Sequence, residues 1–518
     1  MTDTEAGVAP RRRGREGGRR REGSTKSIQQ LPRRRLIRRF PPLDPVSEDE
    51  LESIHATSLR VLEEIGMDFM LQEARDILRD AGADVKGERV RFPRDLIEHG
   101  MRSVPGSFTF HARNPENDIE LGGDAIAFGS VASPPNCADL DRGRRAGTLA
   151  DYRDFLKLIQ YFNAVAFTSG YPVEPIDVHP SIRHLEALRD MAVLTDKPFH
   201  AYSLGAERIL DGIEIARIAR GISSEQLERE PSLFTIVNTN SPLKLDSPML
   251  RGIIEMARRN QIVCITPFTL AGAMAPVTVA GAVVEQNAEA LAGLAFTQIV
   301  RPGAPVIYGG FTSNVDMKSG APAFGTPEYM KATLLGGQLA RRYGVPYRTS
   351  NTCAANAVDA QAAYESVFSL WGVTMGGGNL IMHGAGWLEG GLVASFEKFV
   401  LDVDLIQMVS EFLQPLDMSA DAFGVDAIRE VGPGGHFFGA QHTLARYETA
   451  FYAPLVSDWR NNQQWVASGA PDASQKANAL YKLALADYHE PPMEPAIREE
   501  LDAFVARRKQ EGGSPTDF

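Results

Sequence analysis

The sequence predicts a (β/α)₈ barrel with a helical region before it and a helical extension after it. The chain has 518 residues, of which 43% are hydrophobic and 23% charged, an ordinary globular composition that can bury a large core. Short apolar runs alternate with helical patterns, and eight of these runs mostly follow one another at intervals of roughly 30–45 residues. Eight such units are typical of a closed parallel barrel, and a doubly wound open sheet is the alternative that the same alternation allows.

The first 40 residues have a composition unlike the rest of the chain. They carry twelve Arg and one Lys against four acidic residues. We predict that residues 1–40 form a disordered basic tail, because a segment rich in Gly, Arg and Ser cannot bury a core; contact with RNA, acidic lipid or another protein is the alternative. The whole chain has a net charge of −12, so the remainder is strongly acidic and repels phosphate. Nucleic acid is therefore not expected as the main partner.

Residues 41–107 are predicted to form an N-terminal helical region. Ser47 stands three residues before Glu50, which is the spacing of a capping box, and apolar residues follow at helical spacing. Two further helices are expected near residues 72–82 and 93–102.

The barrel itself is predicted over residues 108–414, and residues 415–518 are predicted to form the C-terminal helical extension. The expected strands cover residues 125–128, 165–169, 199–203, 234–238, 263–268, 306–310, 346–350 and 379–383. Thr326-Pro-Glu has the cap, the proline and the acid of a helix start, and that helix is expected to end at Gly344.

Several functional classes lack their signatures. The three cysteines are far apart and form no CxxC pair, so a reducing cytoplasm is expected. A run of about 18 uncharged apolar residues, which a membrane helix needs, does not occur. The sequence has no GxGxxG fingerprint, phosphate loop or HExxH, so we predict neither a tightly bound cofactor nor a metal site. Because barrels of this size often associate, a homo-oligomer is included among the expectations.

The loops that follow the strands of such a barrel share one face, where active sites lie. His383 ends an apolar strand and opens a glycine-rich loop, so it is the first catalytic candidate; a core histidine bonded to backbone is the alternative. Glu389 is flanked by glycines and is the second catalytic candidate, since its carboxylate attracts an ammonium group, although it serves equally well as a helix cap. Lys244 follows a strand and offers the Schiff-base chemistry of a lyase or aldolase, with a solvated lysine as the alternative.

Four aromatic residues stand at or just after the ends of expected strands: Tyr308, Phe311, Tyr347 and Trp387. A cation within about 6 Å of an aromatic ring gains roughly 0.5–2 kcal/mol. We therefore predict that these rings form a box for a positively charged substrate. Ordinary packing of each ring is the alternative.

Several motifs together resemble the trimethylamine methyltransferase (MttB) family. They are Tyr308-Gly-Gly-Phe-Thr-Ser-Asn, Gly325-Thr-Pro-Glu, Asp359-Ala-Gln-Ala-Ala-Tyr-Glu, Gly384-Ala-Gly-Trp-Leu-Glu-Gly-Gly-Leu and Val431-Gly-Pro-Gly-Gly-His-Phe. The resemblance extends from residue 40 to residue 510, and the motifs are specific in combination rather than singly.

This resemblance implies a (β/α)₈ barrel that moves a methyl group from a methylated amine to the cobalt of a separate corrinoid (cobalamin) protein. Archaeal members carry pyrrolysine after the seventh strand; this chain has none, and Asn356 is the nearest match to its position. The chain therefore resembles the pyrrolysine-free glycine betaine:corrinoid methyltransferases, which act on quaternary amines such as betaines.

A quaternary ammonium already carries its leaving-group charge, so displacement at its methyl group needs no general acid. The protein then supplies placement, a cation box and access for the corrinoid, and Asn356 is counted among the substrate-binding residues. Arg348 or His383 is expected to hold a betaine carboxylate through a charge-assisted hydrogen bond. A lyase or aldolase on the same barrel, and a betaine-binding protein without catalysis, are the alternative functions.

Overall fold

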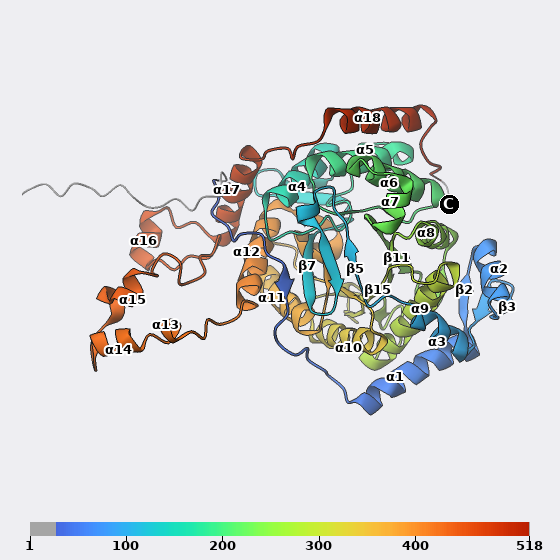
Figure 1. Cartoon of the computed structure of the whole chain (residues 1–518), viewed down its shortest axis with the longest axis horizontal. Coiled ribbons are helices and arrows are strands. Elements are labelled where there is room, and N and C mark those ends of the chain that lie inside the picture. The colour runs from blue at the N-terminus through green and yellow to red at the C-terminus, as the bar shows by residue number, and fades with distance from the viewer. Residues whose placement is uncertain (1–26, 517–518) are drawn as a thin grey trace, which may run out of the picture.

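The computed structural model describes residues 27–516, and it has a mixed α/β fold with a curled eight-stranded sheet at its centre (Figure 1). The strand order is β1-β7-β19-β18-β15-β13-β11-β10, and every pair is parallel except the short β1 (Leu36–Ile37) against β7. The parallel strands are β7 (Ala125–Ser130), β10 (Phe199–His200), β11 (Leu233–Thr239), β13 (Ile262–Pro267), β15 (Val306–Gly309), β18 (Tyr347–Ser350) and β19 (Leu380–Ala385).

Helices follow the strands in sequence and cover the outside of the sheet (Figure 1). They are α4 (Leu149–Tyr161), α5 (Pro180–Leu194), α6 (Ala206–Arg220), α7 (Ser224–Arg229), α8 (Ser247–Arg258), α9 (Val279–Val300), α10 (Pro327–Tyr343), α11 (Ala360–Met375) and α12 (Phe396–Phe412). The predicted start and end of α10 are confirmed: the Thr326 side chain accepts a hydrogen bond from the amide of Tyr329, and Gly344 ends the helix in the left-handed conformation.

The sheet is buried on both faces, which explains why its strands are almost continuously apolar. One apolar cluster fills the concave side and includes Phe234, Cys264 and Ile307. The hairpin of β5 (Ser107–Phe110) and β6 (Ile119–Gly122) adds side chains to this inner cluster. The alternate residues along the strands belong to a second, larger cluster that packs against the surrounding helices.

The segment 165–169, which we expected to be a full strand, forms only a single bridge from Phe167 to Gly129. Its backbone nevertheless bonds in both directions. The Ala166 amide donates to the Phe128 carbonyl on one side at 2.7 Å, and the Thr168 amide donates to the Pro198 carbonyl on the other at 3.0 Å. Only residues 166–168 bond to both neighbours. The pairing between β7 and β10 is therefore too short to form a full strand.

The N-terminal region contains the three expected helices: α1 (Glu48–Arg60), α2 (Gln72–Asp80) and α3 (Arg94–Arg102). The capping box of α1 is confirmed, since Ser47 and Glu50 each bond to the backbone of the other. The region also holds a small sheet that was not predicted. Its strands are β2 (Met67–Phe69), β3 (Asp84–Lys86), β4 (Arg89–Arg91) and the distant β12 (Lys244–Leu245). Strands of two or three residues are too short for an alternating pattern to reveal them.

The predicted tail over residues 1–40 is wrong in its second part. Residues 1–26 lie outside the described part of the chain, whereas residues 27–40 lie against the body of the molecule. Ile28, Leu36 and Arg38 are each less than a tenth exposed, and β1 pairs with β7. The apolar side chains of Ile28 and Leu36 anchor this segment, although its many arginines had suggested that it is fully solvated.

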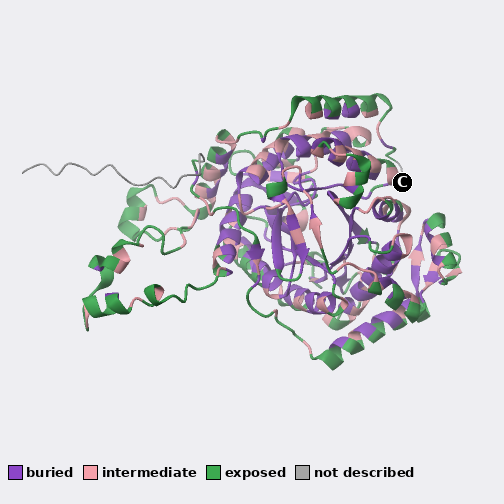
Figure 2. Cartoon of the chain, in the orientation of Figure 1, coloured by how far each residue is buried: buried purple, intermediate pink, exposed green. Residues whose placement is uncertain are grey.

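The chain after α12 leaves the body as an arm, which we define as residues 414–471, and returns through α17 (Ala473–Ala486) and α18 (Pro495–Gln510). Figure 1 shows the arm projecting away from the sheet, and Figure 2 shows that most of it is exposed. Its short helices are α13 (Ala420–Phe423), α14 (Val425–Val431), α15 (Gln441–Leu444) and α16 (Asn462–Ala467). Within the described residues, no helix is both long and apolar enough to cross a membrane.

Candidate functional site

Four of the predicted site residues lie together where the parallel strands end: Phe311, Arg348, His383 and Trp387. The Arg348 guanidinium carbon lies 5.1 Å from the centre of the Phe311 ring. The His383 ring lies 5.8 Å from that of Phe311 and 4.0 Å from that of Trp387. All four side chains are less than a tenth exposed. The cluster therefore combines a cation, an imidazole and aromatic faces in a place shielded from water.

Arg348 is a buried cation without a counter-charge among the described residues. It stands on β18, Nε contacts the Met382 sulfur at 3.2 Å, and Nη1 has no hydrogen-bond partner in the described part of the chain. None of the ion pairs among the described residues includes Arg348. Burial lowers the pKa of Arg348, but a guanidinium keeps its charge in proteins. A buried unpaired cation is costly, so this position favours an anion from outside the chain.

His383 is held neutral at the end of β19. Its Nδ1 lies 3.0 Å from the Ser350 hydroxyl oxygen. Burial, and secondarily the nearby charge of Arg348, hold the pKa of His383 well below its usual range. Its φ of 56° is in the left-handed region, a strained conformation that non-glycine residues adopt rarely. A neutral imidazole adds no positive charge beside a cationic substrate.

Trp387, on β20 (Trp387–Leu388), extends the aromatic part of the cluster. Its ring lies 6.1 Å from Phe311 and 6.2 Å from Phe324. Its indole Nε1 is buried and meets no hydrogen-bond partner among the described residues. Gly391 makes room for the ring, because a Cβ there would lie 2.5 Å from the indole. Trp387 thus offers both a π face and an unused donor beside Phe311.

A buried ion pair on α12 fixes the loop that carries Trp387. Lys398 pairs with Asp402, and both side chains are fully buried. Asp402 also accepts a hydrogen bond from the Gly386 amide at 2.9 Å, and Lys398 donates to the Ser366 hydroxyl at 2.7 Å. The loop that follows β19 is therefore attached to α11 and α12 by charge-assisted bonds that a solvated loop would lack.

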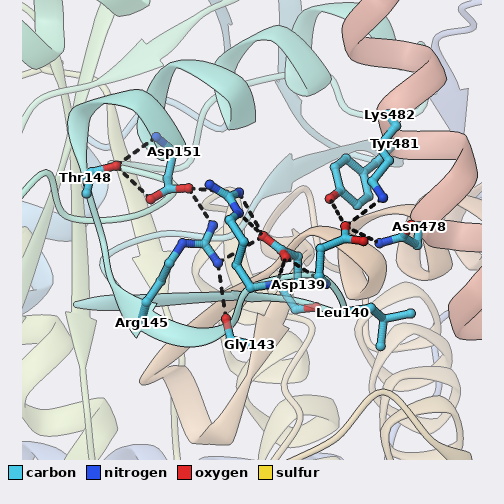
Figure 3. A network of polar contacts seen from close by, with 12 residues as sticks. Asp139, Leu140, Gly143, Arg145, Thr148, Asp151, Asn478, Tyr481 and Lys482 are labelled. Carbon is cyan, nitrogen blue, oxygen red and sulfur yellow. Dashed lines mark hydrogen bonds and ion pairs between the residues drawn. The ribbon is translucent and has the colours of Figure 1, made fainter.

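A second small sheet lies beside the cluster, in the order β20-β21-β8-β9. Its other strands are β21 (Val393–Ser395), β8 (Asn136–Asp139) and β9 (Gly143–Ala146). Figure 3 shows that the β8–β9 turn is tied to two helices. Arg145 pairs with Asp139 and with Asp151 at the start of α4, and Asp141 receives bonds from Lys482 and Asn478 on α17. This network holds the C-terminal extension against the sheet.

Glu389 does not take the role that we predicted for it. Its carboxylate pairs with Arg144 of β9, with Nε–O distances of 3.0 and 3.2 Å. Because Arg144 already neutralises it, Glu389 ties β9 to the loop after β20 and is not a site for an ammonium group.

The prediction that Tyr308 and Tyr347 line the site is also wrong. Both rings point to the helix-facing side of the sheet, where their hydroxyl groups bond to residues of the helices. The Tyr308 hydroxyl donates to Asn287 on α9 at 3.1 Å, and the Tyr347 hydroxyl donates to the Thr333 carbonyl on α10 at 3.0 Å. Side chains alternate along a strand, so Tyr347 faces outward where its neighbour Arg348 faces inward.

Two further candidates are exposed. Asn356 lies on the loop between β18 and α11, outside the buried cluster. Lys244 is exposed on β12, which pairs with β2 of the small N-terminal sheet. A Schiff-base lysine needs a low-polarity setting to lower its pKa, so the position of Lys244 argues against the lyase or aldolase alternative.

Two polar residues of the concave side, Ser350 and His200, were not predicted from the sequence. Ser350 orients His383, as described above. His200 ends β10 and is fully buried, its Nδ1 has no partner among the described residues, and burial lowers the pKa of His200 to about 3. In the sequence, His200 is the second residue of the expected strand 199–203, so the strand-end position that singled out His383 did not select it.

Comparison with known proteins identifies the family. The model of the trimethylamine methyltransferase (MTTB) family matches residues 11–513. The chain belongs to the trimethylamine methyltransferase family. It is therefore a methyltransferase by family, and the recognition made from its motifs is confirmed.

Named relatives cover nearly the whole chain. The glycine betaine methyltransferase of Desulfitobacterium hafniense is 36% identical over 92% of this chain and 99% of its own length. The trimethylamine methyltransferase MttB of the same species is 29% identical over 90% and 94%. Among solved structures, the monomethylamine methyltransferase MtmB of Methanosarcina barkeri matches with a TM-score of 0.52 and 11% identity, over 89% of each chain. At that identity the likeness concerns the fold alone.

Proposed function

We propose that this methyltransferase takes a methyl group from a small quaternary amine that also carries a carboxylate, such as a betaine, and transfers it to the cobalt of a corrinoid carried by a separate protein. The observation that carries the proposal is the buried, unpaired Nη1 of Arg348 beside aromatic rings. A betaine has the complementary pair of charges: a carboxylate for the guanidinium and an ammonium for the rings.

The two orphaned donors of the cluster suit a carboxylate. Arg348 Nη1 and Trp387 Nε1 are both buried without partners in the described chain, and both residues lie against Phe311. Each buried donor left without an acceptor costs free energy, so a carboxylate that accepts from both would be stabilised here. Neutral His383 leaves the trimethylammonium end free of a competing positive charge.

The reaction requires little acid–base chemistry of the chain. The methyl carbon–nitrogen bond breaks, its electron pair stays on nitrogen, and a neutral tertiary amine leaves. A reduced corrinoid supplies the nucleophile when its carrier protein docks. The chain's own residues hold the carboxylate, surround the ammonium with rings and exclude water, so that a methyl group is presented in a fixed direction.

We also infer that the curled sheet is a closed (β/α)₈ barrel. The support is the backbone of residues 166–168, which bonds to β7 on one side and to Pro198, just before β10, on the other. A cytoplasmic location stays a prediction from the sequence.

The test is a panel of methylated amines mixed with chemically reduced cobalamin, with methylcobalamin formation followed by absorbance. We expect the strongest signal with betaines and weaker or no signal with amines that lack a carboxylate, such as trimethylamine. If calorimetry detects betaine binding but no methylcobalamin forms even with a corrinoid protein, the chain is a binding protein. If neither binding nor transfer occurs with betaines, carnitine or trimethylamine, the proposal is wrong.

A further inference from the structure

Large apolar side chains that are exposed concentrate in the arm. Across the described residues there are 28 of them, and twelve lie between residues 416 and 466. These twelve are Leu416, Met418, Phe423, Val425, Ile428, Phe437, Phe438, Leu444, Tyr447, Phe451, Trp459 and Val466. Phe438 and Phe451 are 85% and 87% exposed. Single exposed apolar side chains are normal on a protein surface, but twelve on one segment indicate an interaction surface.

The arm cannot be stable as an isolated segment in water. Its four helices have between four and seven residues, well below the length of about 12–15 residues at which a free helix becomes marginally stable. It is attached to the body at its return, where Asp404 accepts bonds from the amides of Leu455 and Val456. Between α12 and this attachment the structure places most of the arm away from the body (Figure 1). Something else must cover it.

A second uncovered apolar surface lies on the body, along α11. Tyr364, Val367, Phe368 and Trp371 are all more than a third exposed and follow one another at helical spacing. The stripe continues onto α12, because Phe412 lies 5.1 Å from the Trp371 ring. We call these five residues the α11 stripe. The chain's own arm leaves the stripe open, since its members remain exposed in the single chain.

We infer that the arm of one copy covers the α11 stripe of a second copy, in a reciprocal exchange that produces a dimer. Both surfaces are on the same chain, so a two-fold arrangement covers two arms and two stripes at once. If each partly exposed side chain buries roughly 100 Å², the seventeen residues from each of two copies bury on the order of 3,000 Å². Obligate homodimers bury about 2,000–5,000 Å², so the area is sufficient for a permanent assembly.

A corrinoid protein is disfavoured as the partner that covers the arm. A methyl acceptor must dock and leave in every cycle, and transient interfaces are smaller and more polar than permanent ones. The arm exposes twelve large apolar side chains, which suits a partner that stays.

The experiment measures mass in solution for the full chain and for two variants, one on each surface. The chain mass is 56.6 kDa, and we expect light scattering to find at least twice this value for the wild type at micromolar concentration. Phe368→Glu with Trp371→Glu on the stripe, and Phe438→Glu with Phe451→Glu on the arm, should each reduce the mass to that of one chain. These positions are exposed in the single chain, so thermal melting should still be cooperative.

The decisive step mixes the two variants. A stripe variant keeps an intact arm, and an arm variant keeps an intact stripe. A pair made of one of each therefore retains one of the two contacts of the reciprocal exchange. The mixture should again contain two-chain particles, which a tag on one variant captures. The matched control is Ile65→Glu with Val277→Glu, two exposed apolar residues outside both surfaces, which should leave the mass unchanged. A monomeric wild type, dissociation by the control, or no pairing in the mixture would each overturn the inference.

Discussion

Replacing Arg348 by Met removes the charge that the proposed carboxylate needs and keeps much of the side-chain volume. A hydrogen bond to a charged group contributes about 1.5–3 kcal/mol, and each 1.36 kcal/mol is tenfold. We therefore expect Arg348→Met to lower kcat/KM for betaine by about 10- to 150-fold. For tetramethylammonium, which has the same charged head and no carboxylate, the value should change little. The assay is methylcobalamin formation, with binding calorimetry where turnover of tetramethylammonium is too slow.

The same substitution should raise the stability of the protein while it lowers activity on betaine. A loss of activity through damage to the fold would instead lower the stability. Arg348 is buried and has no ion-pair partner within residues 27–516, so an apolar side chain of similar size removes a desolvation cost. Arg348→Met should therefore melt at a higher temperature than the wild type. The control is Arg341→Met, which loses bonds to Asp44 and the Gly376 carbonyl at the other end of the sheet and should leave kcat/KM unchanged. An equal loss on both substrates, or no loss on betaine, would refute the assignment.

Three further outcomes are expected. Trp387→Ala should weaken binding of tetramethylammonium by roughly 2- to 30-fold in calorimetry, because one ring contributes about 0.5–2 kcal/mol to a cation. Betaine should lose more than this, because its carboxylate also loses the indole donor. Tyr308→Phe should leave KM unchanged and lower the melting temperature slightly, because its hydroxyl bonds to Asn287 outside the site. Burial raises the pKa of Glu174 to about 7, so the folded protein holds this proton more tightly than the unfolded chain does. The free energy of unfolding should therefore fall as pH rises from about 4.5 to about 7, by at most about 3 kcal/mol, and Glu174→Gln should remove that slope in urea titrations.

The positions of the strands could be predicted because each is an apolar run between helical patterns. Seven of the eight expected segments contain a parallel strand, and the helix start at Thr326 follows from its cap and proline. The segment 165–169 shows the limit of that method, since its backbone bonds on both sides over only three residues. The small N-terminal sheet was missed because its strands have two or three residues and one of them, β12, comes from far along the chain.

The arm shows a different limit. The sequence predicts helices after residue 415, and α13 to α18 occur there. It could not predict that most of the arm would have no cover within its own chain, because the apolar content of a segment is the same whether it packs on its own body or on another copy. Only the exposed fractions in the folded chain separate these cases.

The composition of the site depends on which face each strand residue takes, and this is where reasoning from the sequence failed. In a strand that is buried on one face only, polar and apolar residues alternate and reveal the direction. The strands of this sheet are buried on both faces, so Tyr347 and Arg348 occur side by side with nothing local to say which points inward. The structure separates them: Tyr347 donates to the carbonyl of Thr333 on α10, whereas Nη1 of Arg348 remains unpaired. A tyrosine is easily satisfied by one helix carbonyl, but a guanidinium packed among helices would need several acceptors at once. The concave side tolerates the arginine if a ligand supplies those acceptors, which is why the unpaired charge, more than the aromatic rings, indicates what this site binds.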